Sequence, residues 1–300
     1  MKNLKDYLVE IEVPSDLVSV IESVVDGIKK IANRIAYADI GKAGTKNVYG
    51  EEQMALDVLS NNLLIDELKE NELIGLIASE ELEDEQKLSD GEYALCFDPL
   101  DGSSLIDVNL AIGTILAIYK TDTFVGVKGD DQLAALTVSY GPRTTMLLTV
   151  CKGVVEFTLN QNLEFVMTKE NLKIEEGKMF APGNLRACSK REDYLELVNY
   201  WCRNEYKLRY SGGFVPDVGQ IIIKGKGIFT YPGFEDAPDG KLRLLVECAP
   251  VSLLVEQAGG AASDGNVRIL EKTIEKIDQR TPIYIGSKEE VERSKEFLNG

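Results

Sequence analysis

The stretch "ALCFDPLDGSSLIDVNLAIG", residues 94–113, changes abruptly from apolar to acidic. It begins within a short apolar run that is typical of a buried strand, and Asp98 and Asp101 follow at once. A second apolar run, "LIGLIAS" at residues 73–79, is followed in the same way by Glu80 and Glu81. Asp, Gly and Ser are common turn formers, so an isolated stretch of this kind can be a loop without function. Two such pairs at the ends of neighbouring strands instead indicate a ligand site.

Carboxylates that cluster in a partly dry site repel one another unless a cation is present. Because Mg²⁺ prefers carboxylate, carbonyl and water oxygens, the sequence predicts a metal centre at these strand ends. Ser103 and Ser104 follow a glycine, and their N–H groups suit a phosphate held by the metals. Glu247 is flanked by apolar residues, so it is either a further ligand or a residue on the solvent side of an amphipathic helix. Lys241 and Arg243 precede it and are natural phosphate contacts in so acidic a chain.

The bulk composition excludes several classes of protein. The chain has 300 residues, 44% of them hydrophobic, which suits a soluble protein of one large or two medium domains. Its net charge of -17 disfavours nucleic acid and anionic membranes as partners. No apolar stretch reaches the roughly 20 residues of a membrane span, and no secretory leader is visible. We therefore expect a cytoplasmic protein, or an organellar one if a transit peptide has been removed.

Missing residues and motifs narrow the chemistry further. The chain has no histidine, which excludes Ser-His-Asp hydrolases, phosphohistidine chemistry and histidine-ligated zinc. The five cysteines are scattered and indicate reduced thiols. An EF-hand would need Glu where Asn109 stands, and no P-loop motif occurs.

Helical and strand patterns alternate along the chain, which predicts an α/β or layered α+β fold. Ser15 is the expected N-cap of a first helix, and Ser287 with Glu290 forms an expected capping box for the last. A long helix through residues 241–260 is expected to kink at Pro250. The other predicted helices cover residues 51–69 and 191–206, and the other predicted strands cover residues 93–97, 113–119, 144–150, 153–159, 163–167 and 282–286. The polar stretch "KENLKIEEGK" predicts a junction between domains 1–177 and 178–300.

Three motifs together resemble the class I fructose-1,6-bisphosphatase family, within the superfamily that includes inositol monophosphatases. They are "FDPLDGSSLID", "ASEE" upstream of it and "KLRLLVECAPVSLLVEQAGG" downstream. The likeness extends over nearly the whole chain. It implies alternating helix and sheet layers (αβαβα), a magnesium-dependent sugar bisphosphatase, and a homodimer or homotetramer. A non-catalytic sugar-phosphate or metal-binding protein on the same scaffold is the alternative of another class.

Several segments look like the sedoheptulose-1,7-bisphosphatase branch of this family, among them "GDDQLAALTVSYGPRTT" and "EGKMFAPGNLRA". Leu105 points the same way, because the fructose enzymes usually carry Asn there. Tyr231 before Pro232 points back to the fructose branch. The resemblance implies hydrolysis of the 1-phosphate of sedoheptulose 1,7-bisphosphate, in the Calvin cycle or pentose phosphate metabolism. A fructose-1,6-bisphosphatase of gluconeogenesis or a dual-specificity enzyme is the alternative.

The resemblance also assigns site residues. The implied ligands of two or three Mg²⁺ ions, with Mn²⁺ as a possible substitute, are Glu51, Glu80, Asp98, Asp101, Glu247 and the Leu100 carbonyl. The implied catalytic residues are Asp57 and Glu81, which would orient and deprotonate the attacking water, together with Glu80. The implied substrate contacts are Asp101, Gly102, Ser103, Ser104, Asn184, Arg186, Arg209, Tyr210, Tyr231, Lys241 and Arg243. Arg209 is expected to reach the site of a neighbouring subunit.

Overall fold

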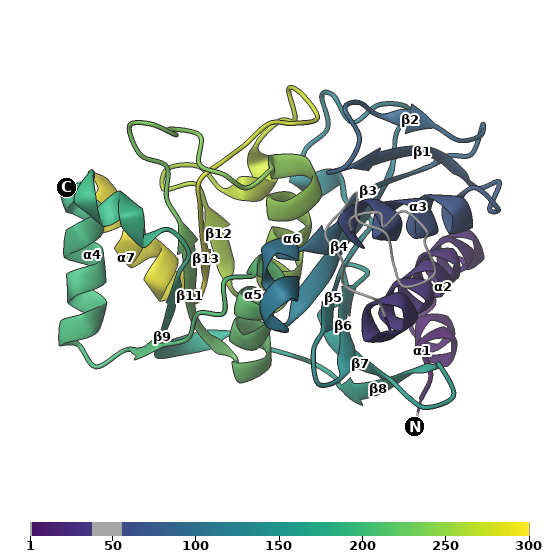
Figure 1. Ribbon diagram of the computed structural model, residues 1–300, viewed down its shortest axis with the longest axis horizontal. Helices are drawn as coiled ribbons and strands as arrows, with labels where there is room; N and C mark the ends of the chain where they lie inside the picture. The colour runs from purple at the N-terminus through teal and green to yellow at the C-terminus, as the bar shows by residue number, and fades with distance from the viewer. Residues whose placement is uncertain (1, 38–55, 300) are drawn as a thin grey trace.

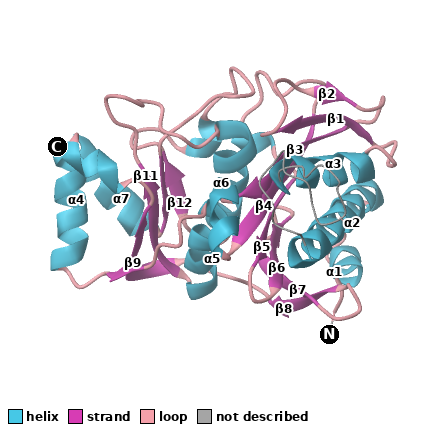
Figure 2. Cartoon of the chain, in the orientation of Figure 1, coloured by secondary structure: helices cyan, strands magenta, loops and turns pink. Residues whose placement is uncertain are grey.

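Five layers of helix and sheet follow one another along the long axis of the molecule (Figure 1). The computed structural model describes residues 2–37 and 56–299. Three N-terminal helices cover one face of an eight-stranded sheet, and a pair of helices separates this sheet from a five-stranded one. Two further helices cover the far face of the second sheet, as Figure 2 shows by element type. This arrangement confirms the predicted αβαβα order.

The first layer is built on amphipathic helices. They are α1 (Leu4–Glu10), α2 (Ser15–Tyr37) and α3 (Leu56–Leu68). The apolar side of α2 is buried, and Ile21, Val24 and Ile28 are inaccessible to solvent. The helix begins at Ser15 itself, so Ser15 is not its N-cap. The predicted second helix is described from Leu56 onward, which includes Asp57.

The first sheet brings the two acidic strand ends together. Its order is β2-β1-β3-β4-β5-β6-β7-β8. The strands are β1 (Ile74–Ser79), β2 (Gln86–Lys87), β3 (Tyr93–Asp101), β4 (Ile112–Lys120), β5 (Ala134–Tyr140), β6 (Thr144–Thr149), β7 (Val155–Leu159) and β8 (Phe165–Lys169). Strands β1 and β3 run parallel, with Ser79 opposite Phe97. Glu80, which follows β1, and Asp98, within β3, therefore lie at the same end of the two strands.

The second sheet begins after a short connection. Its order is β10-β9-β11-β13-β12. The strands are β9 (Glu175–Pro182), β10 (Lys207–Leu208), β11 (Lys226–Tyr231), β12 (Ala261–Ser263) and β13 (Ile283–Gly286). The expected domain boundary between residues 177 and 178 falls inside β9. The change of sheet occurs earlier, between Lys169 and Glu175.

The middle layer consists of α5 (Phe214–Lys224) and α6 (Ala249–Gln257) and joins the two sheets. Apolar side chains of both helices belong to one buried cluster with residues of both sheets. The predicted long helix starts as a π-helical turn, Leu244–Cys248, and continues as α6. Pro250 is the second residue of α6 and directly follows the π-turn, within one continuous helical segment. The irregularity in this helix is thus the π-turn that precedes the proline.

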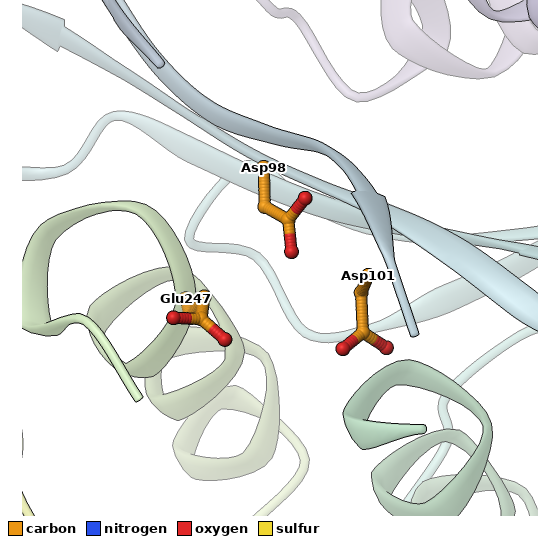
Figure 3. A group of neighbouring side chains, drawn as sticks. All are labelled: Asp98, Asp101 and Glu247. Atoms are coloured by element: carbon orange, nitrogen blue, oxygen red, sulfur yellow. The ribbon is translucent and has the colours of Figure 1, made fainter. Parts of the chain in front are cut away.

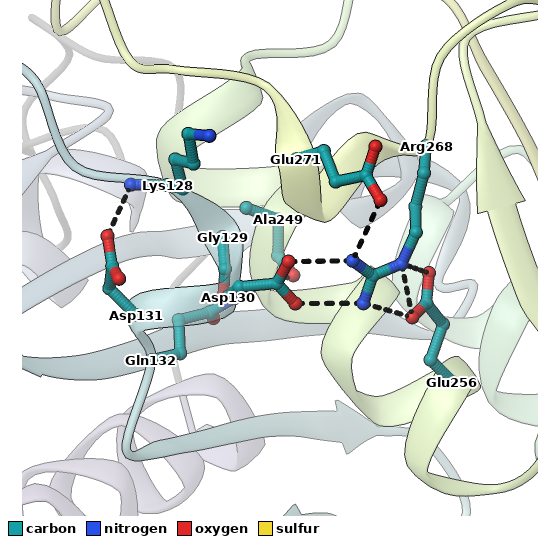
Figure 4. A network of polar contacts seen from close by, with 9 residues as sticks. All are labelled: Lys128, Gly129, Asp130, Asp131, Gln132, Ala249, Glu256, Arg268 and Glu271. Carbon is teal, nitrogen blue, oxygen red and sulfur yellow. Dashed lines mark hydrogen bonds and ion pairs between the residues drawn. The ribbon is translucent and has the colours of Figure 1, made fainter.

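A polar network fixes α6 against the β4–β5 connection (Figure 4). Near the C-terminal end of the helix, Arg268 pairs with Glu256 (2.7 Å) and with Asp130 (2.6 Å). At the N-terminal end, the Gln132 amide donates to the carbonyl of Ala249 (3.1 Å). Both ends of α6 are therefore held, which fixes the π-turn that leads into it.

The last layer consists of α4 (Glu192–Arg203) and α7 (Lys288–Asn299). The expected capping box at α7 is wrong. The Ser287 hydroxyl accepts from Gly227 N–H (3.0 Å) and donates to the Glu175 carbonyl (2.6 Å). The buried Glu290 carboxylate accepts from the Trp201 indole (2.9 Å). Both side chains thus join α7 to its neighbours. No described helix has the length and apolar character needed to cross a membrane.

Candidate active site

Three buried carboxylates converge between the first sheet and the middle layer (Figure 3). Asp98 and Asp101 come from the end of β3, and Glu247 comes from the π-turn. One carboxylate oxygen from each lies within 4.8 Å of the others. Their exposed fractions are only 2%, 8% and 6%. Of the two roles that the sequence left open for Glu247, the structure therefore excludes the solvent-facing one.

Backbone N–H groups hold each carboxylate in place. Asp98 accepts from Leu100 N–H (2.8 Å), and Glu247 accepts from Arg243 N–H (2.6 Å). Asp101 accepts from Val215 N–H (2.7 Å) and Phe214 N–H (3.3 Å), at the start of α5. Since a carboxylate has about four acceptor positions, each group keeps free lone pairs for a further ligand.

Burial gives the three carboxyl groups abnormal acidities. It raises the pKa of Asp98 well above its usual range, and nearby Glu80, Asp101 and Glu247 raise it further. Burial also raises the pKa of Asp101 to about 6 and that of Glu247 to about 8. Among the described residues, no Lys or Arg side chain forms an ion pair with any of the three. Three carboxylates that have no cationic ion-pair partner, and that offer only oxygen atoms as ligands, fit a hard divalent cation such as Mg²⁺.

A second acidic pair follows β1 beside this cluster. Glu80 N–H donates to the Phe97 carbonyl (3.0 Å), which ties the ends of β1 and β3 together. Arg243 donates to the Glu80 carbonyl (2.7 Å) and lies 3.7 Å from its carboxylate. Glu80 lines the same cavity as the cluster, but it does not belong to the group of three converging carboxylates.

Glu81 and Asp57 lie close enough to influence each other. Burial raises the pKa of Glu81, and the negative charges of Asp57 and Glu80 add to the effect. A buried bond from the Ser79 hydroxyl to Asn61 (2.6 Å) joins the end of β1 to α3. Ser79 also accepts from Glu81 N–H (3.2 Å). Because α3 carries both Asp57 and Asn61, the bond between Ser79 and Asn61 fixes the position of Asp57 relative to Glu81. Glu51 lies outside the described residues.

The carboxylates open into a cavity of about 230 Å³. The predicted residues that line it are Glu80, Asp98, Leu100, Asp101, Gly102, Ser103, Ser104, Tyr210, Tyr231, Lys241, Arg243 and Glu247. Ser103 and Ser104 begin a 3₁₀ helix, Ser103–Val108, after Gly102 in the left-handed conformation (φ 78°). Glycine adopts this conformation without strain. The structure therefore brings acidic, hydroxyl and cationic groups to one cavity.

Three predicted substrate contacts do not line this cavity. Asn184 is buried, and its side chain donates to the Pro232 carbonyl (3.5 Å). Arg186 is exposed on the next turn. Arg209 is also exposed and donates to the Leu208 carbonyl (3.1 Å). Their predicted contacts with substrate remain predictions.

Sequence reasoning missed two residues of this region. Arg280 lines the cavity, although nothing in its local sequence marks it. Asp217 is fully buried and accepts from the N–H groups of Ser211 (2.7 Å) and Gly212 (3.3 Å). It thereby shapes the turn after Tyr210. An acidic residue in the first turn of a helix is common, so only the structure shows that Asp217 is buried and which groups it holds.

Comparison with known proteins agrees with this geometry. Residues 5–170 match the family described as fructose-1-6-bisphosphatase, N-terminal domain, and residues 174–299 match the C-terminal domain. The class 1 fructose-1,6-bisphosphatase of Trichlorobacter lovleyi is 45% identical over 99% of this chain and 95% of its own length. The chloroplastic sedoheptulose-1,7-bisphosphatase of Triticum aestivum is 41% identical over 99% of this chain and 77% of its own.

Solved structures give the same result. A putative sedoheptulose-1,7-bisphosphatase from Toxoplasma gondii matches with a TM-score of 0.92 and 34% identity, covering 100% of this chain and 99% of the other. The holo form of Leishmania major fructose-1,6-bisphosphatase matches with a TM-score of 0.91 and 32% identity at the same coverage. These matches confirm the resemblance seen in the sequence. The chain is therefore a phosphatase of the fructose-1,6-bisphosphatase family.

Proposed function

We propose that this protein is a magnesium-dependent sugar bisphosphatase that hydrolyses the 1-phosphate of sedoheptulose 1,7-bisphosphate to sedoheptulose 7-phosphate and phosphate. One observation carries the proposal: the buried cluster of Asp98, Asp101 and Glu247 opens into the same cavity as Lys241 and Arg243. Oxygen ligands for a metal and cations for a phosphate are the two requirements of this reaction. The family membership supports the same chemistry.

The metal would be held by the cluster, by Glu80 and by the carbonyl of Leu100, with Glu51 as a predicted further ligand. Two or three Mg²⁺ ions, or Mn²⁺ in their place, would neutralise these carboxylates, polarise the phosphoryl group and lower the pKa of a water. Asp101 and Glu247 are already oriented by backbone N–H groups. Little rearrangement is therefore needed for binding.

Proton transfer would fall to Glu81 and Asp57. Burial raises the pKa of Glu81, so its carboxylate is a stronger base than an exposed one. It would accept the proton of the attacking water, while Asp57 orients that water. The bond between Ser79 and Asn61 would keep the two acids in register.

The phosphate would be held by the hydroxyl and N–H groups of Ser103 and Ser104 and by Arg243. As the ester bond breaks, negative charge spreads over the phosphoryl oxygens and the leaving alkoxide. Donors fixed before the reaction stabilise this charge without reorganisation. Arg243 is fixed in this way, because it donates to the Glu80 carbonyl (2.7 Å).

The sugar and its remote phosphate would meet Tyr210, Tyr231 and Lys241, which line the cavity, together with Asn184 and Arg186, which do not line it. Arg209 would reach the site of a neighbouring subunit in a homodimer or homotetramer. In this scheme residues 1–177 supply the catalytic acids and most metal ligands, and residues 178–300 supply Glu247 and the sugar contacts. We further propose that the enzyme works in the cytoplasm.

The preference for a seven-carbon sugar is supported by Leu105, because the fructose enzymes usually carry Asn at this position. A methyl carbon of Leu105 lies 3.2 Å from the position of a Cβ on Gly212, so the side chain packs against a wall of the cavity. Fructose 1,6-bisphosphate is the alternative substrate, favoured by the bacterial relatives and by Tyr231. Activity on both sugars is also consistent with the site, because one CHOH unit is worth little binding energy.

The test is to measure kcat/KM for the two bisphosphates side by side with Mg²⁺. A higher value for sedoheptulose 1,7-bisphosphate is expected, and Leu105→Asn should shift the ratio toward the fructose substrate. A higher value for fructose 1,6-bisphosphate in the wild type would favour the alternative. A protein that binds both sugars without releasing phosphate would be a non-catalytic binding protein.

A further inference from the structure

Arg280 faces the cavity beside Arg243, although the two side chains carry the same charge. The two residues are partners in an antiparallel β-bridge, and both line the cavity. Backbone hydrogen bonds on either side fix the pairing. Leu244 N–H donates to the Gln279 carbonyl (2.6 Å), and Thr281 N–H donates to the Leu242 carbonyl (3.0 Å). Directly opposed residues have Cβ atoms about 5 Å apart, with their side chains on one face.

Like charges placed directly opposite each other are unfavourable. The charge of Arg243 is partly compensated, because Glu80 lies 3.7 Å away. No described carboxylate forms an ion pair or hydrogen bond with the exposed side chain of Arg280. The arrangement therefore leaves positive charge directed at the cavity.

We propose that Arg280 is a further substrate-binding residue that forms a guanidinium clamp with Arg243 around one phosphate group. This inference rests on the proposed function and deepens it. The planar guanidinium group binds phosphate oxygens through two parallel hydrogen bonds, and a doubly negative phosphate offsets the repulsion between the arginines. Arg243 is bonded to the Glu80 backbone beside the carboxylate cluster. The clamped phosphate is therefore the one nearer to the cluster.

The test uses inorganic phosphate, titrated by calorimetry into the full-length protein with Mg²⁺ present. Arg280→Gln should raise the dissociation constant about tenfold, since a charge-assisted pair is lost. Arg280→Lys should lose less phosphate affinity, because lysine keeps the positive charge but lacks the two parallel N–H donors of the guanidinium group. Arg143→Gln is the matched control, because Arg143 is an exposed arginine in the turn between β5 and β6 and does not line the cavity. It should bind phosphate like the wild type.

Equal affinities in Arg280→Gln and Arg143→Gln would overturn the inference, and so would a wild type that binds no phosphate at millimolar concentration. Steady-state kinetics add a second readout: KM for the bisphosphate should rise several-fold in Arg280→Gln. Failure of the proposed function looks different. In that case the wild type releases no phosphate from either sugar, yet phosphate binding still depends on Arg280. Thermal unfolding should match between the two Gln variants, because residues 279–281 bond to residues 242–244 through backbone groups only.

Discussion

Replacing Glu247 by Gln should stabilise the metal-free protein and abolish its activity. Glu247 is buried beside Asp98 and Asp101. Gln has nearly the same shape, and its side-chain oxygen can still accept the bond from Arg243 N–H. The substitution therefore removes a buried negative charge and little else.

The size of the effect follows from the acidity of Glu247. Burial, followed by the charge of Glu80, raises its pKa from 4.5 to about 8. Between these values the folded protein binds a proton that the unfolded chain has lost, so this group makes stability fall as the pH rises. Each pKa unit corresponds to about 1.4 kcal/mol. The carboxylates of the cluster titrate together, so the full shift does not belong to Glu247 alone. We expect Glu247→Gln to raise the free energy of unfolding by about 1–3 kcal/mol at pH 8 and by little at pH 5.

Thermal unfolding in EDTA at pH 5, 6.5 and 8 measures this difference. The wild-type melting temperature should fall from pH 6.5 to pH 8 more steeply than that of Glu247→Gln, and Mg²⁺ should raise the wild-type value more. Glu235→Gln is the matched control, since Glu235 is exposed and does not line the cavity. A Glu247→Gln variant that is less stable than the wild type in EDTA at pH 8 would show that the buried charge of Glu247 does not destabilise the metal-free protein.

Three further predictions concern the catalytic residues and their support. Glu81→Gln should abolish phosphate release while the circular dichroism spectrum and melting temperature stay close to those of the wild type; normal turnover would remove Glu81 from the mechanism. Ser79→Ala leaves Asn61 without its buried partner and should cost about 1–3 kcal/mol in urea unfolding, with a lower kcat. Asp217→Asn should raise KM more than it lowers kcat, because Asp217 holds Ser211 and the turn after Tyr210; an unchanged KM would contradict this role.

Several strands with apolar runs were predictable from the sequence, but β5 and β11 were not predicted although both are largely buried. Residues 73–79 and 93–97 correspond to β1 and β3, and their parallel pairing accounts for the acidic edge. Strand β9 was missed because it begins with the polar residues Glu175 and Glu176 and becomes buried only from Met179 onward. The capping box at Ser287 was wrong because strand backbone groups compete for its hydroxyl. Local patterns do not contain such tertiary partners.

In the candidate site, too, some residues were predictable from local sequence and others depended on tertiary contacts. Asp98 and Asp101 were predictable because they follow directly from a buried strand, and Glu247 because it interrupts an apolar run. Arg280 was not predictable, since its place depends on a bridge between segments more than 30 residues apart in the chain. Hydrophobic periodicity in the sequence marks the buried face of an element, but it does not identify the tertiary partner of an individual side chain.

The most direct test of the account is phosphate release from sedoheptulose 1,7-bisphosphate by the purified wild-type protein, with Mg²⁺ and then with excess EDTA. Fructose 1,6-bisphosphate is assayed in parallel. We expect multiple turnovers with Mg²⁺, loss of activity in EDTA, and recovery when Mg²⁺ is restored. Undiminished release in EDTA, or no release from either sugar with Mg²⁺, would contradict the assignment of the buried carboxylates as the metal centre of a bisphosphatase.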